Sequence, residues 1–256
     1  LAIIDIENVY TPSTENTNAY ADRLGNVTDA ISSLKNRRIN SSYACAYYPW
    51  VQIQDPLNRQ RVWVPPSVVA LGTFASSEKK TAPWFAPAGF NRGGLADPTT
   101  AGMRVLRVTE RVVAKDRDRL YAANINPIAK FPNEGIVVFG QKTLQVTPSA
   151  LDRINVRRLL IYIKKEISKI STGILFDQNV KVTWSRFKAQ AEGFLSTVKS
   201  SLGLTEYKVV LDETTTTPDL VDRNIVYAKI FLKPARSIEF IAIDFVITRT
   251  GASFED

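Results

Sequence analysis

The chain has 256 residues, of which 45% are hydrophobic, and its formal net charge is +8. It contains no histidine and a single cysteine, which excludes histidine-based catalytic triads, histidine-containing metal sites and internal disulfides. The positive charge indicates affinity for an acidic partner, whether nucleic acid, membrane or protein. No apolar run reaches the ~20 residues of a membrane helix, so we expect no membrane insertion.

The first 47 residues favour a strand, a helix and a second strand. Residues 1–6 form a short apolar run, and residues 42–47 form another that includes Cys45, which we expect to be a small core residue. Between them, apolar residues recur at helical spacing at Tyr20, Leu24, Val27, Ile31 and Leu34. This β-α-β order is typical of a mixed or parallel sheet covered by helices. Because an apolar strand begins the chain without an initiator Met, we expect a piece of a longer polypeptide whose amino-terminal part is absent.

The middle of the chain alternates short elements with one long irregular segment. We predict a strand at residues 61–64, a helix at 67–77, a charged helix at 110–121, and strands at 125–131 and 136–139. Prolines and glycines disfavour regular structure in residues 81–95, whereas Trp84, Phe85 and Phe90 in that segment require burial.

The longest predicted helix starts at residues 147–150, with either Thr147 or Ser149 as its cap. Its apolar stripe comprises Val156, Leu159, Leu160, Ile163, Ile167 and Ile170. The rest of its surface is strongly basic, which fits either a solvated face or a docking face for an acidic surface. A second amphipathic helix follows, capped near Thr183 and ended by Gly203. A weak boundary near residue 177 would divide the chain into regions 1–176 and 177–256, packed as one unit.

Two long strands, at residues 225–233 and 237–249, are predicted to form a closing hairpin around a tight turn at 234–236. The second strand is apolar on both faces, so we expect both faces to be covered. The tail that follows is either a frayed terminus or a strand whose partner belongs to another molecule.

Two features resemble catalytic or cofactor-binding motifs. Residues 135–143 differ by one residue from a phosphate-binding loop, because Gln141 separates Gly140 from Lys142. The residues between the two glycines are strand formers and no helix follows, which argues against a nucleotide site. The carboxylate pairs at residues 116/118 and 212/213 lie in charged or polar stretches without a pocket signature. We therefore expect no enzyme activity, no cofactor and no metal.

Several segments, in this order, resemble the contractile tail sheath proteins of T-even-like myovirus bacteriophages. They are residues 48–51 (YPWV), 64–67 (VPPS), 83–89 (PWFAPAG), 120–127 (LYAANINP), 135–140 (GIVVFG), 154–159 (INVRRL) and 236–241 (RSIEFI). The resemblance covers nearly the whole chain and points to the carboxyl-terminal half of such a protein. It implies an α/β (α+β) fold, with a mixed β-sheet flanked by helices and an extended C-terminal arm for inter-subunit strand addition.

The resemblance also implies a mechanical function. Sheath subunits polymerise as stacked hexameric rings around the tail tube and contract to drive the tube through the host envelope. The implied partners are further copies of the chain, an acidic tail tube protein, and the baseplate and tail terminator proteins. The implied location is the virion tail, assembled in the host cytoplasm, with no nucleic acid among the partners. A basic nucleic-acid-binding domain is the alternative, although the aromatic residues do not alternate with Lys and Arg on an exposed face.

Two sets of residues are candidates for intermolecular contacts. The family's carboxyl-terminal arm corresponds to Ile247, Thr248, Arg249, Thr250, Gly251, Ala252, Ser253 and Phe254, with Gly251 as a hinge. The candidates for tube contact are the basic residues of the two long helices, namely Arg153, Arg157, Arg158, Lys164, Lys165, Lys169, Arg186 and Lys188.

Overall fold

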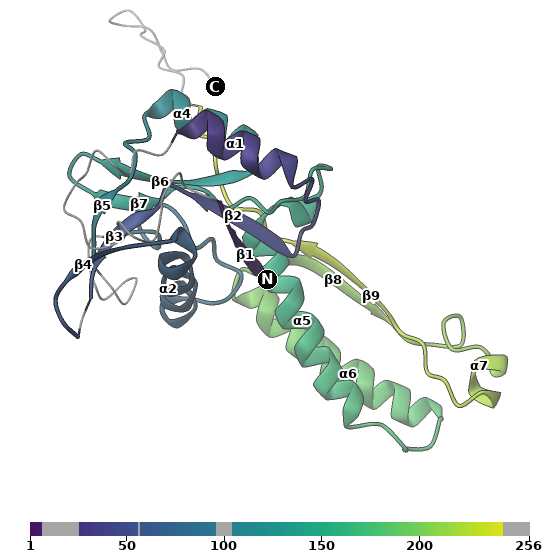
Figure 1. Ribbon diagram of the computed structural model, residues 1–256. Helices are drawn as coiled ribbons and strands as arrows, with labels where there is room; N and C mark the ends of the chain where they lie inside the picture. The colour runs from purple at the N-terminus through teal and green to yellow at the C-terminus, as the bar shows by residue number, and fades with distance from the viewer. Residues whose placement is uncertain (7–25, 56, 96–103, 243–256) are drawn as a thin grey trace, which may run out of the picture.

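The computed structural model describes residues 1–6, 26–55, 57–95 and 104–242. Its main sheet has four strands in the order β1 (Ala2–Asp5), β2 (Ala44–Tyr48), β6 (Ile125–Phe131) and β7 (Gly135–Val138). The first three strands run parallel and β7 runs antiparallel to β6. The predicted mixed sheet flanked by helices is therefore confirmed (Figure 1).

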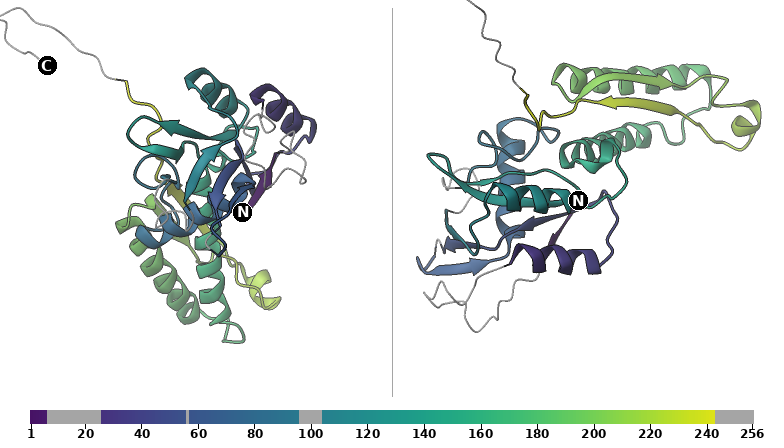
Figure 2. Two further views of the ribbon diagram at one scale, coloured as in Figure 1. Left: turned by 60° about the vertical axis from the view of Figure 1, so that its left-hand side comes forward. Right: turned by 90° about the horizontal axis from the view of Figure 1, so that it is seen from above.

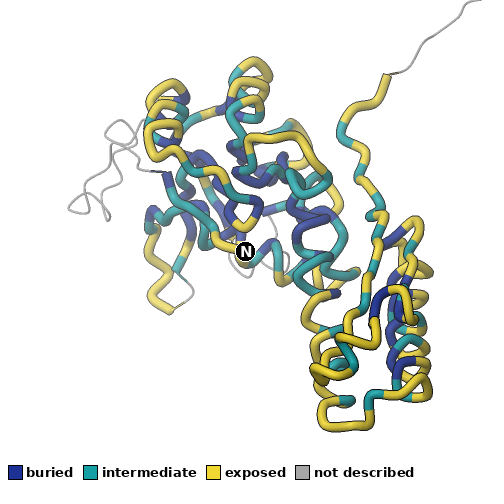
Figure 3. The backbone as a smooth tube through the Cα atoms, turned by 90° about the vertical axis from the view of Figure 1, so that its right-hand side faces the viewer, coloured by how far each residue is buried: buried dark blue, intermediate teal, exposed yellow. Residues whose placement is uncertain are grey.

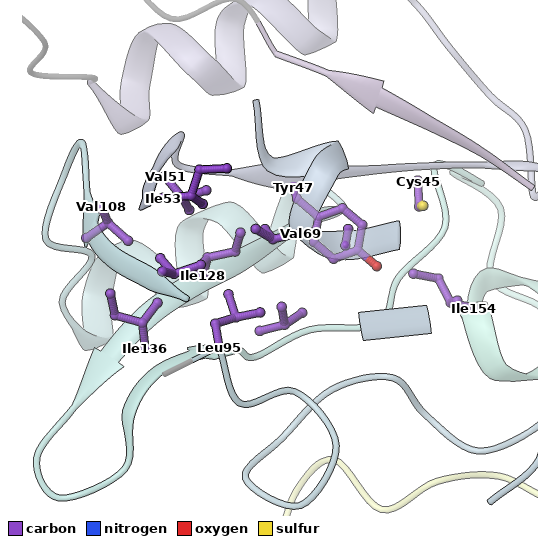
Figure 4. Packing of buried hydrophobic residues seen from close by; sticks show 13 residues of the cluster. Cys45, Tyr47, Val51, Ile53, Val69, Leu95, Val108, Ile128, Ile136 and Ile154 are labelled. Carbon is purple, nitrogen blue, oxygen red and sulfur yellow. The ribbon is translucent and has the colours of Figure 1, made fainter. Parts of the chain in front are cut away.

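Strand β2 lies between two separate hydrophobic cores, one on each face of the main sheet. Its residues Ala44, Ala46 and Tyr48 pack with α1 (Val27–Asn36) and α4 (Ala114–Ala122) on one face of the sheet. Its residues Cys45 and Tyr47 point to the other face, toward α2 (Pro66–Lys80) and Ile154 (Figure 4). Burial on both faces explains why this strand reads as a continuous apolar run.

A second, antiparallel sheet lies beside the main one, in the order β4 (Arg61–Val64), β3 (Val51–Gln54) and β5 (Val105–Val108). Its apolar residues Val51, Ile53, Val105 and Val108 join the same core as α2. The irregular segment before residue 95 reaches this core through Leu95, which is fully buried. Trp84 and Phe85 are half-buried as expected, but Phe90 is 49% exposed, so its predicted burial is wrong.

Helices α5 (Ile154–Thr172) and α6 (Lys181–Ser200) project from the main sheet with a two-stranded ribbon, β8 (Leu204–Val210) and β9 (Lys229–Pro234). Figures 1 and 2 show the helices and the ribbon side by side, with the short helix α7 (Pro218–Asp222) at the far end. A third core joins these elements and contains Leu159, Ile163, Trp184, Phe187, Ala191, Leu195, Val198, Leu204, Val209 and Leu211. No helix in the described part of the chain is long and apolar enough to cross a membrane.

Both long helices begin differently from the prediction. Ser149 caps a short 3-10 helix, η3 (Ala150–Asp152), by accepting a 3.0 Å hydrogen bond from the Leu151 amide. Extended backbone at Arg153 then separates η3 from α5. Helix α6 starts at Lys181 without a side-chain cap and, at 20 residues, is one residue longer than α5. Helix α1 is confirmed for its second half, whereas Tyr20 and Leu24 lie outside the described residues.

The predicted closing hairpin is wrong in its described part. Strand β9 pairs antiparallel with β8, and residues 235–242 form no strand. Ile238 and Phe240 are each 83% exposed, so the expected coverage of both faces is absent there. The remainder of the predicted strand, residues 243–249, lies outside the described residues. The apolar alternation of residues 237–242 thus did not indicate a strand, and the partner of β9 is β8.

Candidate subunit interface

The β8–β9 ribbon has one covered face and two open edges. Helix α6 packs under β8, and the side chains of β9 alternate between half-buried Ile230 and Leu232 and exposed residues such as Phe231. Among the described residues, β8 forms its ladder only with β9, and β9 only with β8. A two-stranded ribbon is marginal by itself, and each open edge presents unpaired backbone donors and acceptors. The ribbon can therefore accept a further strand on either side.

Residues 235–242 leave the ribbon and run back along the body of the protein (Figure 3). Ser237 and Glu239 point to the body, where they bind Asn155, Arg153 and Gln141. Ile238 and Phe240, which alternate with them, are almost fully exposed. Polar side chains thus anchor this segment and apolar ones face solvent, which is the reverse of an ordinary surface strand. We did not predict this role for Ser237 and Glu239, although the period-two polar positions within an apolar run were the available signal.

The three arginines at the start of α5, among the eight predicted tube-contact residues, contact other parts of the chain. Arg157 is 4% exposed, donates a hydrogen bond to Ser42 and stacks over the Tyr43 ring at 4.0 Å. Arg158 bonds Glu78 at 2.9 Å, and burial lowers its pKa. Arg153 pairs with Glu239 at 2.6 Å and with Asp152 at 3.1 Å. Arg157 is therefore not on a solvated face, Arg153 and Arg158 are half-buried, and contact of any of the three with a tube stays a prediction.

The other five candidates are exposed or half-buried along α5 and α6. Lys169 pairs with Glu166 at 2.7 Å, Arg186 pairs with Asp177, and Lys188 lies 4.0 Å from Glu192. Lys164 and Lys165 are exposed, and no described carboxylate pairs with either of them. These two lysines are therefore the predicted contact residues whose charge is most available to a partner. The predicted arm, residues 247–254, lies outside the described residues.

The segment that resembles a phosphate-binding loop is built as a strand and a packed turn. Gly135–Val138 is β7, and a Cβ on Gly140 would lie 2.9 Å from Asn126 Oδ1. The Lys142 amide donates to that same Oδ1 at 2.6 Å, and its ammonium donates to the Tyr121 carbonyl at 2.8 Å. The backbone amide and the ammonium group of Lys142, which would donate to a phosphate, are thus already hydrogen-bonded within the protein.

Three of the four paired carboxylates make structural contacts, and Cys45 is buried. Asp116 pairs with Arg119 at 3.5 Å, and Glu213 pairs with Lys181 at 2.6 Å. Asp212 accepts hydrogen bonds from Thr214, which lower its pKa. Cys45 is fully buried, as predicted, and burial raises the pKa of its thiol to about 12. Within the described residues, no three acidic or cysteine side chains gather in a way that could hold a metal ion.

Comparison with known proteins gives consistent matches. Residues 146–248 match the family described as phage tail sheath C-terminal domain. The tail sheath protein of Vibrio phage KVP40 is 36% identical over 229 residues, which are 90% of this chain and 33% of that protein. The tail sheath protein of Enterobacteria phage T4 is 35% identical over 246 residues, which are 96% of this chain and 36% of that protein.

A solved structure shares the fold. The sheath complex of PVC, an extracellular contractile injection system in its contracted state, matches with a TM-score of 0.73 and 25% identity over 85% of this chain and 60% of that chain. The chain spans about a third of the length of the two curated relatives. With a sheath-domain match, close relatives from two phages and the same fold in a sheath complex, this chain belongs to the phage tail sheath proteins.

Proposed function

We propose that this chain is part of a structural subunit of a contractile phage tail sheath, with no enzymatic role. Copies of the subunit polymerise as stacked hexameric rings around a tail tube, contact the baseplate and terminator proteins, and shorten to drive the tube through the host envelope. The subunit is assembled in the host cytoplasm and resides in the virion tail. The names of the two phage relatives and the contracted sheath complex support this proposal.

The open edges of the β8–β9 ribbon are the observation that carries the proposal. A polymer that shortens needs links that persist while its subunits rotate against one another. A strand from a neighbouring copy, added to β8 or β9, supplies such a link through backbone hydrogen bonds. Residues 247–254 are the proposed strand, and Gly251 is its proposed hinge. The half-buried, half-exposed alternation of β9 leaves Phe231, at 57% exposed, as an apolar contact for the added strand.

The test is a truncation of the full-length protein. Removal of every residue after Val246 should leave a folded protein that forms no cylinders in negative-stain electron microscopy. The control removes only Glu255 and Asp256, so the proposed strand remains, and it should polymerise like the parent. Far-UV circular dichroism checks that both proteins fold. Cylinders formed by the longer truncation would refute the role of the arm.

The proposed contact with an acidic tube lies on the exposed lysines of α5. Opposite charges on two facing surfaces attract, and salt weakens this attraction when the charges remain hydrated. Changing Lys164 and Lys165 to Glu should reduce sheath assembly on isolated tubes in cosedimentation, most clearly at low salt. Changing Lys79 and Lys115 to Glu, at exposed positions of α2 and α4, is the control for net charge. If the α5 variant binds tubes like the control, this face does not contact the tube.

A further inference from the structure

We propose that Glu239 and the side chains around it form a latch that holds residues 235–240 on the protein body. The arm that follows then pivots beyond Phe240 and not at the end of β9. The proposal rests on the proposed function, because the pivot of the arm matters only where the arm joins two subunits. It assigns a positioning role to Gln141 and Arg153, which lie far from the β8–β9 ribbon in sequence.

The Glu239 carboxylate sits among three donors that come from three separate elements. Arg153 Nε donates to Glu239 Oε1 at 2.6 Å, and Gln141 Nε2 donates to the same oxygen at 3.2 Å. The Tyr121 hydroxyl also hydrogen-bonds Glu239, which helps to raise the pKa of Tyr121 beyond the effect of burial. Charge-assisted hydrogen bonds of this kind are shorter and stronger than neutral ones. Residues from α4, the β7–η3 connection and the start of α5 thus converge on one side chain.

A second contact fixes the same segment two residues earlier. Asn155 Nδ2 donates to the Ser237 hydroxyl at 3.1 Å, so both inward-facing residues of the segment are bound to the body. In the described part of residues 235–242, the only backbone hydrogen bond is from Ala235 N–H to the Gly203 carbonyl at 3.1 Å. Side chains therefore hold this segment, and its release does not require a backbone ladder to break.

The carboxylate of Glu239 also balances positive charge on the protein body. Burial lowers the pKa of Lys142 and the charge of Arg153 lowers it further, whereas the charges of Glu239 and Asp152 raise it. When Glu239 leaves, the two neighbouring cations lose one of their two counter-charges. The side chains of Glu239 and Arg153 are only 15% and 27% exposed, so solvent replaces the lost contact incompletely. The electrostatics of the body thus favour the bound segment.

The latch sets how far the arm can reach. With Glu239 bound, residues 235–240 stay on the body and the reach of the proposed arm is counted from Phe240, which is 83% exposed. With Glu239 released, the six residues 235–240 join the arm and lengthen it by about 20 Å when extended. A subunit can therefore hold its neighbour on a short link or on a long one without losing the link itself.

Trypsin measures the latch in the full-length protein before any assembly. Arg236 is exposed, but trypsin must bind extended backbone on both sides of the bond that it cuts, so we expect cleavage there only after the held segment leaves the body, whereas the bond after Lys233 is protected by Pro234. Glu239→Ala should accelerate release of the fragment that begins at Ser237 by about tenfold or more, with a smaller effect for Glu239→Gln. The control is Glu206→Gln, which removes an exposed ion pair with Lys233 on the ribbon itself.

The thermal unfolding midpoint separates a latch from a general loss of stability. We expect Glu206→Gln to keep the midpoint of the parent, and the two Glu239 variants to lower it only slightly, because they remove a partly buried counter-charge but leave the three cores intact. Equal cleavage rates for Glu239→Ala and the parent would overturn the proposal. Faster cleavage that a lower thermal unfolding midpoint fully explains would overturn it as well.

Electron microscopy of the same proteins then separates the latch from the function. If the parent forms cylinders, Glu239→Ala should form fewer of them or none at the same concentration, and an equal yield would overturn the positioning role. If the parent forms no cylinders, the proposed function fails, and the cleavage rates still decide whether the latch exists.

Discussion

Arg157 gives the most direct test of how the basic helix is built. Although it stands in a run of cations on α5, its side chain is 4% exposed and contacts Ser42 and the Tyr43 ring. A hydrogen bond involving a charged group contributes about 1.5–3 kcal/mol, and a cation–π contact about 0.5–2 kcal/mol. Desolvation of the guanidinium offsets part of this sum. We therefore expect Arg157→Ala to lower the free energy of unfolding by about 2–4 kcal/mol.

The assay is urea denaturation followed by circular dichroism, with Lys164→Ala as the matched control. Lys164 lies on the same helix, is exposed, and should change the free energy of unfolding by no more than about 0.5 kcal/mol. Ser42→Ala should lower the free energy of unfolding by about 1–3 kcal/mol, because it leaves a buried guanidinium donor of Arg157 unpaired. The double variant of Ser42→Ala and Arg157→Ala should lower the free energy of unfolding by less than the sum of the two single changes, since both remove the same contact.

Equal stability of Arg157→Ala and Lys164→Ala would refute this reasoning. Arg157 would then be a surface residue, and it would become eligible again for a contact with the tube. A large loss of stability instead means that assembly defects of Arg157 variants report folding and say nothing about the tube.

Two further predictions concern glycines and pH. Gly93→Ala should destabilise the protein by about 1–3 kcal/mol, since the new Cβ would lie 2.5 Å from the Val138 carbonyl oxygen. Gly193→Ala, in open space within α6, should instead stabilise it by about 0.5–1 kcal/mol. A urea midpoint that does not fall for Gly93→Ala, or does not rise for Gly193→Ala, would contradict the corresponding expectation. Burial raises the pKa of Glu110 despite the hydrogen bond from Tyr48, so its contribution to stability is present below its ordinary pKa and lost as pH rises through the raised value. Glu110→Gln, which mimics the protonated acid, should therefore gain stability relative to the parent as pH rises from acid to neutral, and a gain seen only in acid would contradict the assignment.

The predictions of the fold succeeded where local sequence determines the structure. The β-α-β start, helix α2 and strands β4, β6 and β7 all follow from apolar periodicity and from the prolines and glycines between elements. Strand β3 was missed because Val51–Gln54 is only four residues long and lies between Pro49 and Pro56. The pairing of β9 with β8 could not be read from periodicity, since a polar loop and α7 separate these strands and the nearer apolar run competed for the same role.

The site was harder to predict. The charge and hydrophobicity of a residue do not show which part of the chain, or which other molecule, covers it. The side chains of Arg157 and Arg158 look solvated in the sequence, yet each stacks on an aromatic ring of another element. Conversely, Ile238 and Phe240 look like core residues and are exposed. Glu239 was counted as part of an apolar strand, and its three donors come from positions about 85 to 118 residues away. The division near residue 177 stays a prediction, while the buried cores change partway along α5.

Helix α5 belongs to two of the buried cores. Ile154, at its first turn, packs in the core beneath the main sheet, whereas Leu159 and Ile163 pack with α6 and the ribbon. One continuous helix therefore connects the core beneath the main sheet with the core beneath the ribbon. Since Arg153 precedes the first turn of this helix and binds Glu239, the proposed arm and the proposed strand addition on the ribbon would both act on α5, the arm at its amino-terminal end.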